Sequence, residues 1–354
     1  MLYVFLLAVD LLGTGIAGFG EDFTDQLFRG IDNPLLGLLV GVLATVLAQS
    51  SSVSTATVVG LVASGAIGVS DAVPVIMGAN IGTTITNTLA SLGSVRRTEE
   101  FRRAFTGATM HDVFNVCSVA ILLPLELLTG VLSRIAVWLS DLVGDAQTGE
   151  FESPLRAAVA GVTEVIEGVV SAIVPGPFAG AAVLLALGLA LIFATLYGIT
   201  RNMRVVMAGP AERSLNAVLG RAGSLAILLG ALLTVAVQSS SIATSLLIPM
   251  VAAGVLRLDH AYPMTLGANL GTTISALLAA LAVPGIFGLQ IALVHLVFNV
   301  AGLLVFYPVP ALRRLPLAIA ARVADHAVRR RALVLTYIVL FFYAVPLVGI
   351  LILR

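Results

Sequence analysis

The sequence predicts an all-α membrane protein of two inverted repeats, each with a re-entrant hairpin followed by a broken transmembrane helix. The first observation is composition: 59% of the 354 residues are apolar and 11% are charged, whereas about 25% are charged in soluble domains. The second is distribution, because the 19 basic residues, all Arg, cluster between long uncharged stretches. A helix needs about 20 apolar residues to cross a bilayer, so we expect a multi-pass protein of the cell (inner) membrane.

Composition also excludes several classes of protein. The formal net charge is zero, which gives no basis for binding nucleic acid. The single Cys117 rules out an internal disulfide framework or a thiolate metal site. The apolar runs are too long and uniform for the alternating strands of an outer-membrane barrel. Segment 2–16 lacks both a basic start and a cleavage site, so we expect a retained first helix with Asp10 at a helix interface.

The third observation is an internal duplication. The tetrapeptide Gln-Ser-Ser-Ser at 49–52 recurs at 238–241, and Gly-Ala-Asn-Ile-Gly-Thr-Thr-Ile at 78–85 recurs at 267–274 with Leu for the first Ile. Both motifs recur at the same offset, and nearly half of the positions in 49–92 are identical in the second copy. Two polar motifs of this length do not recur by chance between apolar segments, so we infer two structural repeats.

Arginines in the loops predict that the two repeats are inverted in the membrane. Loop 93–103 holds four Arg, whereas its counterpart 283–286 holds no charge; segment 18–33 is acidic, whereas its counterpart 201–221 holds four Arg. Cytoplasmic loops carry the excess of basic residues, so corresponding loops lie on opposite sides. Inverted repeats are typical of secondary transporters, whose sites lie near the midplane where the repeats meet.

Each serine motif interrupts an apolar segment. In repeat one, 34–48 and 53–67 flank the polar tip; in repeat two, 224–237 and 242–256 do so. Each arm is too short to cross alone, and the joined arms would form an abnormally long helix with a polar centre. We therefore predict re-entrant hairpins, whose irregular tips must be buried in protein or line a wet cavity.

The segment after each hairpin, 73–92 or 263–283, is long enough to cross, but its centre contains two glycines. Glycine weakens a helix by about 1 kcal/mol relative to alanine, so breaks are expected at 80–82 and 269–271. A break exposes a helix N-terminus to anions and free carbonyls to cations.

Two other interpretations compete with a binding site. Serine and threonine are common where membrane helices pack closely, but these motifs occur twice, in inverted positions. A membrane serine hydrolase needs one nucleophile beside one base, and the chain has no Gly-x-Ser-x-Gly elbow. We therefore expect a transport site and no enzyme activity.

At these motifs the sequence resembles the type II sodium-dependent phosphate cotransporters. The resemblance rests on both Gln-Ser-Ser-Ser motifs, both Gly-Ala-Asn motifs and the run Phe-Arg-Arg-Ala-Phe-Thr-Gly-Ala-Thr-Met-His-Asp-Val-Phe-Asn at 101–115, and it covers 34–127 and 224–302. It implies sodium-driven uptake of inorganic phosphate, with the serine motifs at the substrate site. Two departures are the lack of paired cysteines in the connector and the single apolar segment after Arg331.

Side-chain chemistry agrees with a site for both ions. Hydroxyl donors and helix N-termini suit phosphate, whereas amide and carbonyl oxygens suit a hard cation. The expected phosphate ligands are Ser50, Ser51, Ser52, Thr83, Thr84, Ser239, Ser240, Ser241, Thr272 and Thr273. The expected sodium ligands are Gln49, Asn80, Gln238 and Asn269. The residues expected to support the broken helices by hydrogen bonds are His111, Asn115, His295 and Asn299.

Two of these assignments leave alternatives. The paired histidines could serve proton coupling instead of support. Asp112, which Leu296 replaces in repeat two, could add an acidic group to one half, but we expect it to pair with Arg102 or Arg103.

Four parts are expected along the chain: the first helix with repeat one (1–127), a connector (128–200), repeat two (201–308), and a basic amphipathic segment with the last transmembrane helix (309–354). The connector should hold interfacial helices at 127–142 and 158–173 and a crossing helix at 179–199. We expect the N-terminus and 313–331 to be cytoplasmic, and 144–154 and the C-terminus to be external.

The predicted function is sodium–phosphate symport by alternating access, with sodium ions as the coupling ion. The expected partners are inorganic phosphate, sodium and the lipid bilayer, and a homo-oligomer is left open. Another oxyanion or a carboxylate could use the same hydroxyl and dipole chemistry. A membrane phosphate sensor would bind its ligand without moving it.

Overall fold

The computed structural model describes residues 2–19, 31, 33–145, 154–192, 194–195, 223–281, 283 and 285–354, and all regular structure in these ranges is helical. Three helices there are long and apolar enough to cross a membrane: α7 (Thr98–Thr129), α15 (Phe287–Phe306) and the C-terminal helix Ala332–Leu353. The C-terminal helix comprises α17 (Ala332–Val339), a π-helical turn η2 (Leu340–Ala344) and α18 (Val345–Leu353). The predicted all-α class is confirmed.

Repeat one forms two helices joined by a tight turn, and then a bent helix. α3 (Pro34–Ala48) starts where the Asn33 side chain accepts a hydrogen bond from the Leu35 amide at 3.0 Å, an N-cap followed by proline at the first helical position. The later helices are α4 (Ser51–Ala63), α5 (Val69–Gly82), α6 (Ile85–Ser91), the short 3₁₀ helix η1 (Leu92–Ser94) and α7. The predicted interruption of 73–92 is present, just after the expected residues.

Repeat two has the same order, but the counterpart of α4 is divided in two and the counterpart of α5 and α6 is one helix. Its helices are α11 (Ser224–Val237), α12 (Ser240–Ser245), α13 (Leu247–Ala252), α14 (Leu258–Ala280) and α15. α14 is continuous, so the predicted break at 269–271 is wrong. The glycines serve packing instead: a Cβ on Gly267 would lie 1.9 Å from the carbonyl oxygen of Ile227, and one on Gly271 would lie 2.7 Å from that of Ala231.

Equivalent glycines bring the first helix of each repeat into backbone contact with the helix after the hairpin. In repeat one, a Cβ on Gly41 would lie 2.0 Å from the carbonyl oxygen of Val75, and one on Gly78 would lie 2.0 Å from that of Leu38. In repeat two, a Cβ on Gly230 would lie 2.0 Å from the carbonyl oxygen of Met264. Small residues at such crossings let membrane helices approach closely, so α3 packs on α5 as α11 packs on α14.

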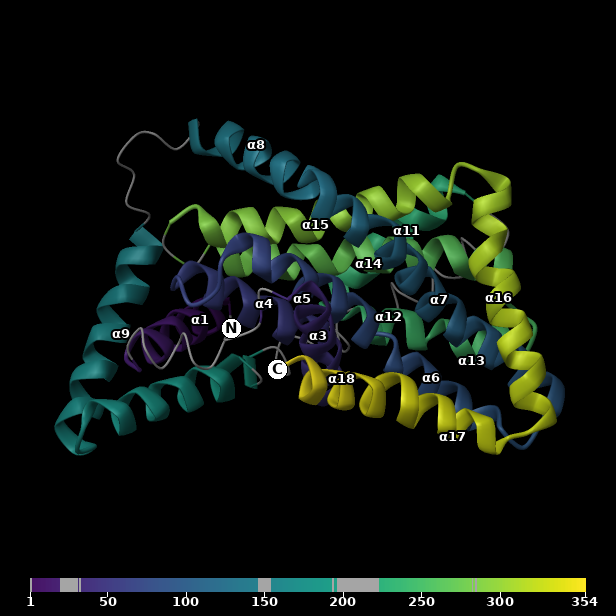
Figure 1. The fold of residues 1–354 in the computed structure, drawn as a ribbon, viewed down its shortest axis with the longest axis horizontal. Coiled ribbons are helices and arrows are strands. Elements are labelled where there is room, and N and C mark those ends of the chain that lie inside the picture. The colour runs from purple at the N-terminus through teal and green to yellow at the C-terminus, as the bar shows by residue number, and fades with distance from the viewer. Residues whose placement is uncertain are drawn as a thin grey trace.

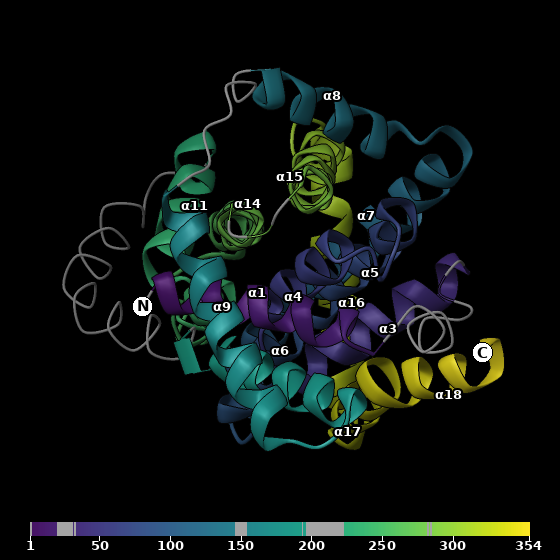
Figure 2. The same ribbon diagram turned by 90° about the vertical axis from the view of Figure 1, so that its left-hand side faces the viewer.

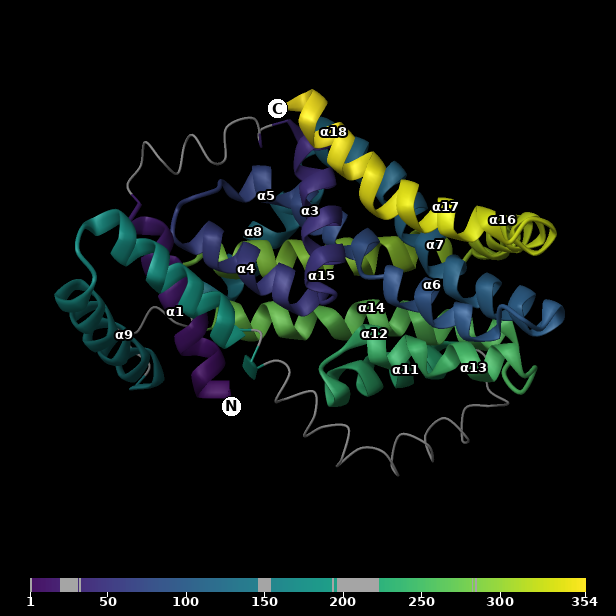
Figure 3. The same ribbon diagram turned by 90° about the horizontal axis from the view of Figure 1, so that it is seen from below.

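The helices after the two hairpins run in opposite directions. Gly254, just before α14, lies beside the Arg103 guanidinium near the start of α7, which follows α6. Val283, just after α14, lines a small cavity with Ala63 and Ser64 at the end of α4, which precedes α5. α14 lies beside α15 when the molecule is viewed along its long axis (Figure 2). α11, α12 and α13 lie on one side of α14, and α3, α4 and α5 lie on the other (Figure 3).

Two amphipathic helices lie across opposite ends of the molecule. α9 (Pro154–Ile173) and α16 (Pro310–Arg329) both run across the long axis that α14 and α15 follow (Figure 1). α1 (Leu2–Ala17) packs against α9, where Thr163 Oγ1 donates to Asp10 Oδ2 at 2.6 Å. The expected interface position of Asp10 is therefore confirmed.

The start of the chain departs from the predicted arrangement. The Tyr3 hydroxyl donates to the carbonyl oxygen of Ala158 at 2.9 Å, so the start of α1 lies at the α9 end. The N-terminus and α16 therefore lie at opposite ends of the molecule, although both are predicted to be cytoplasmic.

The structure describes the predicted connector and the segment after it only in part. α8 (Val131–Asp145) exposes Trp138, as an interfacial helix would. The helix Pro177–Ile192 covers part of the crossing predicted at 179–199. The external connector at 146–153, the end of that crossing and the arginine-rich segment 201–222 lie outside the described residues.

Replacing Gly78 by Ala should lower the midpoint of thermal unfolding in detergent. The new methyl group would overlap the Leu38 carbonyl and force α3 from α5, and overpacking of this kind costs about 1–3 kcal/mol. Gly161→Ala in α9 is the matched control, because nothing lies within 4 Å of the added Cβ; it should keep or raise the midpoint. Equal midpoints for the two variants would contradict the packing role of Gly78.

Candidate functional site

Two glutamines form the turns between the hairpin helices. Gln49 and Gln238 each have φ of 53°, and in the described ranges they are the non-glycine residues with positive φ. Their Nε2 atoms donate to the carbonyl oxygens of Val46 at 2.8 Å and Val235 at 2.7 Å. Left-handed backbone costs a non-glycine residue about 1–2 kcal/mol, and such strain concentrates at functional sites. Each amide nitrogen closes a helix end, which leaves the amide oxygen as an acceptor.

The serine motifs start the second helix of each hairpin. Ser50 Oγ accepts from the Val53 amide and Ser239 Oγ accepts from the Ile242 amide, both at 3.3 Å. A hydroxyl that accepts in this way keeps its hydrogen for donation. Ser51, Ser52 and Ser240 are buried, and Ser241 is half-buried. The Ser240 hydroxyl has no hydrogen-bond partner in the described part of the chain.

The two turns are linked through Ser275 of α14. Ser52 Oγ donates to Ser275 Oγ at 3.3 Å, and Ser275 Oγ donates to Gln238 Oε1 at 3.1 Å. The predicted approach of the two turns is therefore present, by way of a third residue. The sequence analysis did not identify Ser275. The one sign of it in the sequence is a polar residue in the otherwise apolar second half of the predicted crossing segment 263–283.

A second link between the repeats runs through Asn87 of α6. The hydroxyls of Thr244 and Ser245 donate to Asn87 Oδ1 at 2.8 and 3.2 Å. Asn87 Nδ2 lies 3.3 Å from His111 Nδ1. Asn87 was also missed, because Ala276 replaces it in repeat two and the duplication gave no second copy to mark it.

His111 and Asn115 continue this link into a chain of buried side chains. His111 Nε2 lies 2.6 Å from Asn269 Oδ1, Asn269 Nδ2 donates to Asn115 Oδ1 at 2.7 Å, and Asn115 Nδ2 donates to the Asn80 carbonyl at 2.6 Å. The network assigns the hydrogen to Nε2, because Nδ1 must accept from Asn87. The predicted support of the helix at Asn80 by Asn115 is present, and His111 holds the partner repeat's Asn269.

The equivalent residues of repeat two form no such chain. His295 is fully buried, and neither ring nitrogen has a partner in the described ranges. Asn299 Nδ2 donates to the His295 carbonyl, and Asn80 Nδ2 donates to the Ile76 carbonyl, each at 3.0 Å within its own helix. The support expected from His295 and Asn299 is therefore absent from this arrangement.

The threonines of the two glycine motifs donate to their own helices. Thr83 and Thr84 bond the carbonyls of Ala79 and Ile81 at 2.8 and 2.7 Å. Thr272 and Thr273 likewise bond those of Ala268 and Leu270, at 3.0 and 2.7 Å. A hydroxyl has one hydrogen and two lone pairs, so these four oxygens can still accept but have no hydrogen left to donate.

Asp112 lies among hydroxyls, and the predicted pairing with Arg102 or Arg103 is wrong. Tyr337 OH donates to Asp112 Oδ2 at 2.7 Å, and Thr88 Oγ1 does so at 3.2 Å. Asp112 is out of reach of those arginines because it lies nine and ten residues further along α7, about 14–15 Å along the helix axis.

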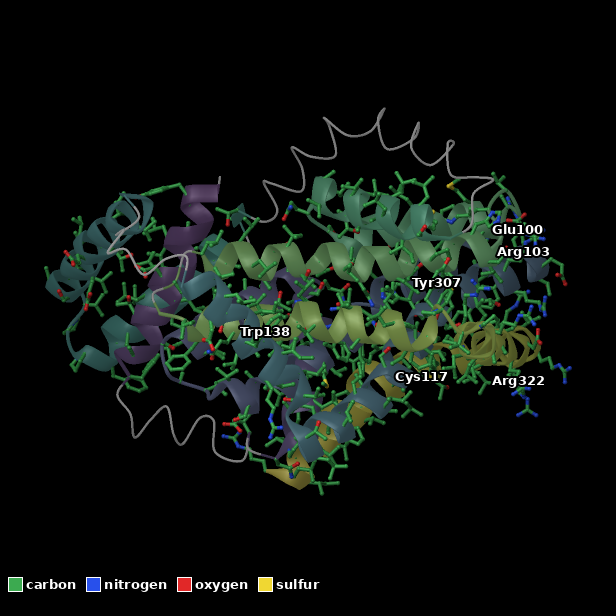
Figure 4. All side chains as sticks on the ribbon, turned by 90° about the horizontal axis from the view of Figure 1, so that it is seen from above. Glu100, Arg103, Cys117, Trp138, Tyr307 and Arg322 are labelled. Carbon is green, nitrogen blue, oxygen red and sulfur yellow. The ribbon has the colours of Figure 1, made fainter. Side chains whose placement is uncertain are left out.

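The charged side chains of α7 instead join other elements at the α16 end. Arg102 Nε bonds Asp325 of α16 at 2.5 Å, and this hydrogen bond holds the pKa of Asp325 below its usual value. Arg103 Nε donates to the Ala252 carbonyl at 2.9 Å. Figure 4 shows Glu100, Arg103 and Arg322 at this end, far along the molecule from Trp138.

Comparisons with known proteins identify the family of the chain. A model of the Na+/Pi-cotransporter family matches residues 4–137 and 191–320. Sodium-dependent phosphate transport protein 2B of Homo sapiens is 34% identical over 98% of this chain and 63% of its own length. Sodium-dependent phosphate transport protein 2A of Ovis aries is 33% identical over 98% of this chain and 65% of its own length. The chain thus spans less than two thirds of these relatives.

No solved structure matches the chain. The family model nevertheless covers more than half of it, across both repeats. The chain belongs to the Na+/Pi-cotransporter family.

Proposed function

We propose that the chain is a sodium-coupled symporter of inorganic phosphate that works by alternating access in the cell (inner) membrane. The observation that carries the proposal is the link through Ser275, which joins two serine-rich turns from different repeats inside an apolar protein. The names of the relatives, sodium-dependent phosphate transport proteins, supply the substrate and the coupling ion.

Phosphate is assigned to the serine hydroxyls and the helix starts. Ser50 and Ser239 retain hydrogens that can point at an anion, and Ser240 has a buried hydroxyl without a partner in the described residues. Helix N-termini attract anions through free amides and the helix dipole. The motif serines are neutral groups, so they bind phosphate less tightly than an arginine clamp and permit its release. Ser52 can donate to phosphate only by giving up its hydrogen bond to Ser275.

Sodium is assigned to oxygens that can only accept. No donor in the described ranges reaches the side-chain oxygens of Gln49 and Asn80. The threonine pairs of both glycine motifs have committed their hydrogens to backbone carbonyls. We therefore move these threonines from the phosphate ligands, where the sequence places them, to the sodium ligands. Gln238 and Asn269 stay with sodium through the second lone pair of each amide oxygen.

Coupling to sodium has an electrostatic reason. Phosphate carries one to two negative charges near neutral pH, and each costs about 2.3 kcal/mol per 100 mV of opposing membrane potential. Sodium in the same step offsets this cost and the loss of hydration. Binding of phosphate therefore depends on the sodium gradient.

The proposed architecture is two inverted repeats whose hairpins enter the membrane without crossing it. Its support is the equivalent glycine crossings, the opposite directions of α14 and the α5–α6 pair, and the arginines gathered at the α16 end. We place the α16 end in the cytoplasm because basic residues favour that side. The repeats occupy 1–127 and 201–308, separated by the connector at 128–200 and followed by 309–354.

Reconstituted protein should take up radiolabelled phosphate only when an inward sodium gradient is present. Empty vesicles and a potassium gradient are the controls. Equal uptake without sodium would sink the symport assignment. Flux of sulfate or a dicarboxylate in place of phosphate would identify a different substrate, and tight phosphate binding without flux would identify a sensor.

Serine and glutamine variants should fail in different ways. Ser240→Ala should raise the phosphate concentration for half-maximal uptake at least about tenfold, because a hydrogen bond to a charged group contributes about 1.5–3 kcal/mol. Gln49→Leu should chiefly raise the sodium concentration required, since it removes an amide oxygen. Ser171→Ala in α9 is the control, because the exposed Ser171 hydroxyl bonds the Gly168 carbonyl of its own helix. If Ser240→Ala and Gln49→Leu both resemble the parent at limiting phosphate and limiting sodium, the site lies elsewhere.

A further inference from the structure

Equivalent residues of the two repeats have different hydrogen-bond partners in this structure. The His111 side chain reaches across to Asn269 at 2.6 Å, and Asn115 reaches the Asn80 carbonyl. The equivalent His295 has two unpartnered ring nitrogens within the described ranges, although it is fully buried. Buried polar groups in proteins almost always have partners, so the position of His295 calls for an explanation.

The missing partners of His295 lie on a helix that already packs against its own. α15, which carries His295 and Asn299, contacts α5, which carries Asn80, just as α7 contacts α14. The Asn80 amide nitrogen is turned to its own helix, whereas the equivalent Asn269 bonds side chains of α7. Both helix pairs are therefore present, but only one is joined by side-chain hydrogen bonds.

α7 and α15 also meet at equivalent positions. A Cβ on Gly302 would lie 2.9 Å from Ser118 Oγ, and these two residues correspond in the repeat alignment that pairs His111 with His295. Equivalent residues can touch only close to the axis that relates the repeats. The axis that relates the two histidines therefore passes near this contact.

We propose that His295 and Asn299 are the positioning residues of the opposite-facing state of the transporter. In that state His295 Nε2 donates to Asn80 Oδ1, Asn80 Nδ2 donates to Asn299 Oδ1, and Asn299 Nδ2 donates to the Asn269 carbonyl. The chain through His111 opens at the same time. This inference rests on the proposed function, because it requires a protein with two exchangeable states.

The exchange would keep the free energies of the two states close to each other. Each state pairs one histidine and leaves the other buried without partners, so the costs of the two states nearly cancel and the transporter can cycle. The balance is not exact, because Asn87 adds a link to His111 that Ala276 cannot provide to His295. The state described here should therefore predominate in the absence of ligands.

The test measures the two states directly, by distances between spin labels at each end of the protein. In a Cys117→Ala background, one label pair is Arg97→Cys with Val255→Cys at the α16 end. The other is Ser70→Cys with Phe287→Cys at the opposite end. All four positions are exposed. The two positions of each pair belong to different repeats, so opening at one end lengthens one distance as the other shortens.

His111→Ala and His295→Ala should shift the ratio of the two states in opposite directions, each by about tenfold, the effect of one net hydrogen bond. Asn299→Ala should shift it in the same direction as His295→Ala. His295→Gln, which keeps a donor, should restore part of the ratio. Met110→Ala and Val294→Ala, buried neighbours of the two histidines, control for cavities and should leave the ratio near that of the parent.

Shifts in the same direction for both histidine variants, or unchanged distances in all variants, would overturn the exchange. Phosphate uptake by the parent protein is measured in addition to the label distances. Sodium-dependent uptake with unmoved distances leaves the proposed function intact and removes this inference alone, whereas loss of uptake in the parent counts against the proposed function.

Discussion

Satisfying polar groups in an interior that excludes water is the constraint on which the rest of this structure depends. An unpartnered polar group in an apolar medium costs several kcal/mol, and this protein buries the side chains of Asn80, Asn115 and Asn269, whereas Gln49 is exposed and Gln238 is half-buried at the turns. Each turn is closed by its own glutamine, whose amide nitrogen returns to the helix before it. The same bond leaves an amide oxygen to accept a cation, so the device that stabilises the turn also prepares the site.

Close helix packing makes this arrangement possible. Glycines at equivalent positions let α3 contact α5, and α11 contact α14, through the backbone. The asparagines of the glycine motifs then lie within reach of α7, where Asn115 bonds the Asn80 carbonyl and the Asn269 side chain. Larger residues at the crossings would separate the helices and break these links, so packing and site chemistry cannot vary independently.

The duplicated motifs predicted where the turns lie, whereas two residues without an identical second copy were missed. Duplicated motifs located both glutamine turns and the first hairpin helices, with α3 and α11 at the expected bounds. Ser275 and Asn87 have no identical counterpart, and only the folded chain shows that they join the repeats. The prediction of a break in α14 was wrong because helix propensity takes no account of tertiary contacts. Gly267 and Gly271 pack closely against the backbone of α11. The roles of the threonines depended on their backbone partners, which composition does not reveal.

Binding of the two ions should be coupled, because each turn carries proposed donors to phosphate, its serines, and a proposed acceptor for sodium, its glutamine. A ligand that binds only the folded protein raises its unfolding temperature, and coupling between two ligands is reciprocal. The most direct measurement is the thermal unfolding midpoint of the purified protein in detergent, with phosphate titrated in sodium and in potassium at equal ionic strength. Our account predicts that phosphate raises the midpoint in sodium and has little effect in potassium. An equal rise in both salts would contradict it.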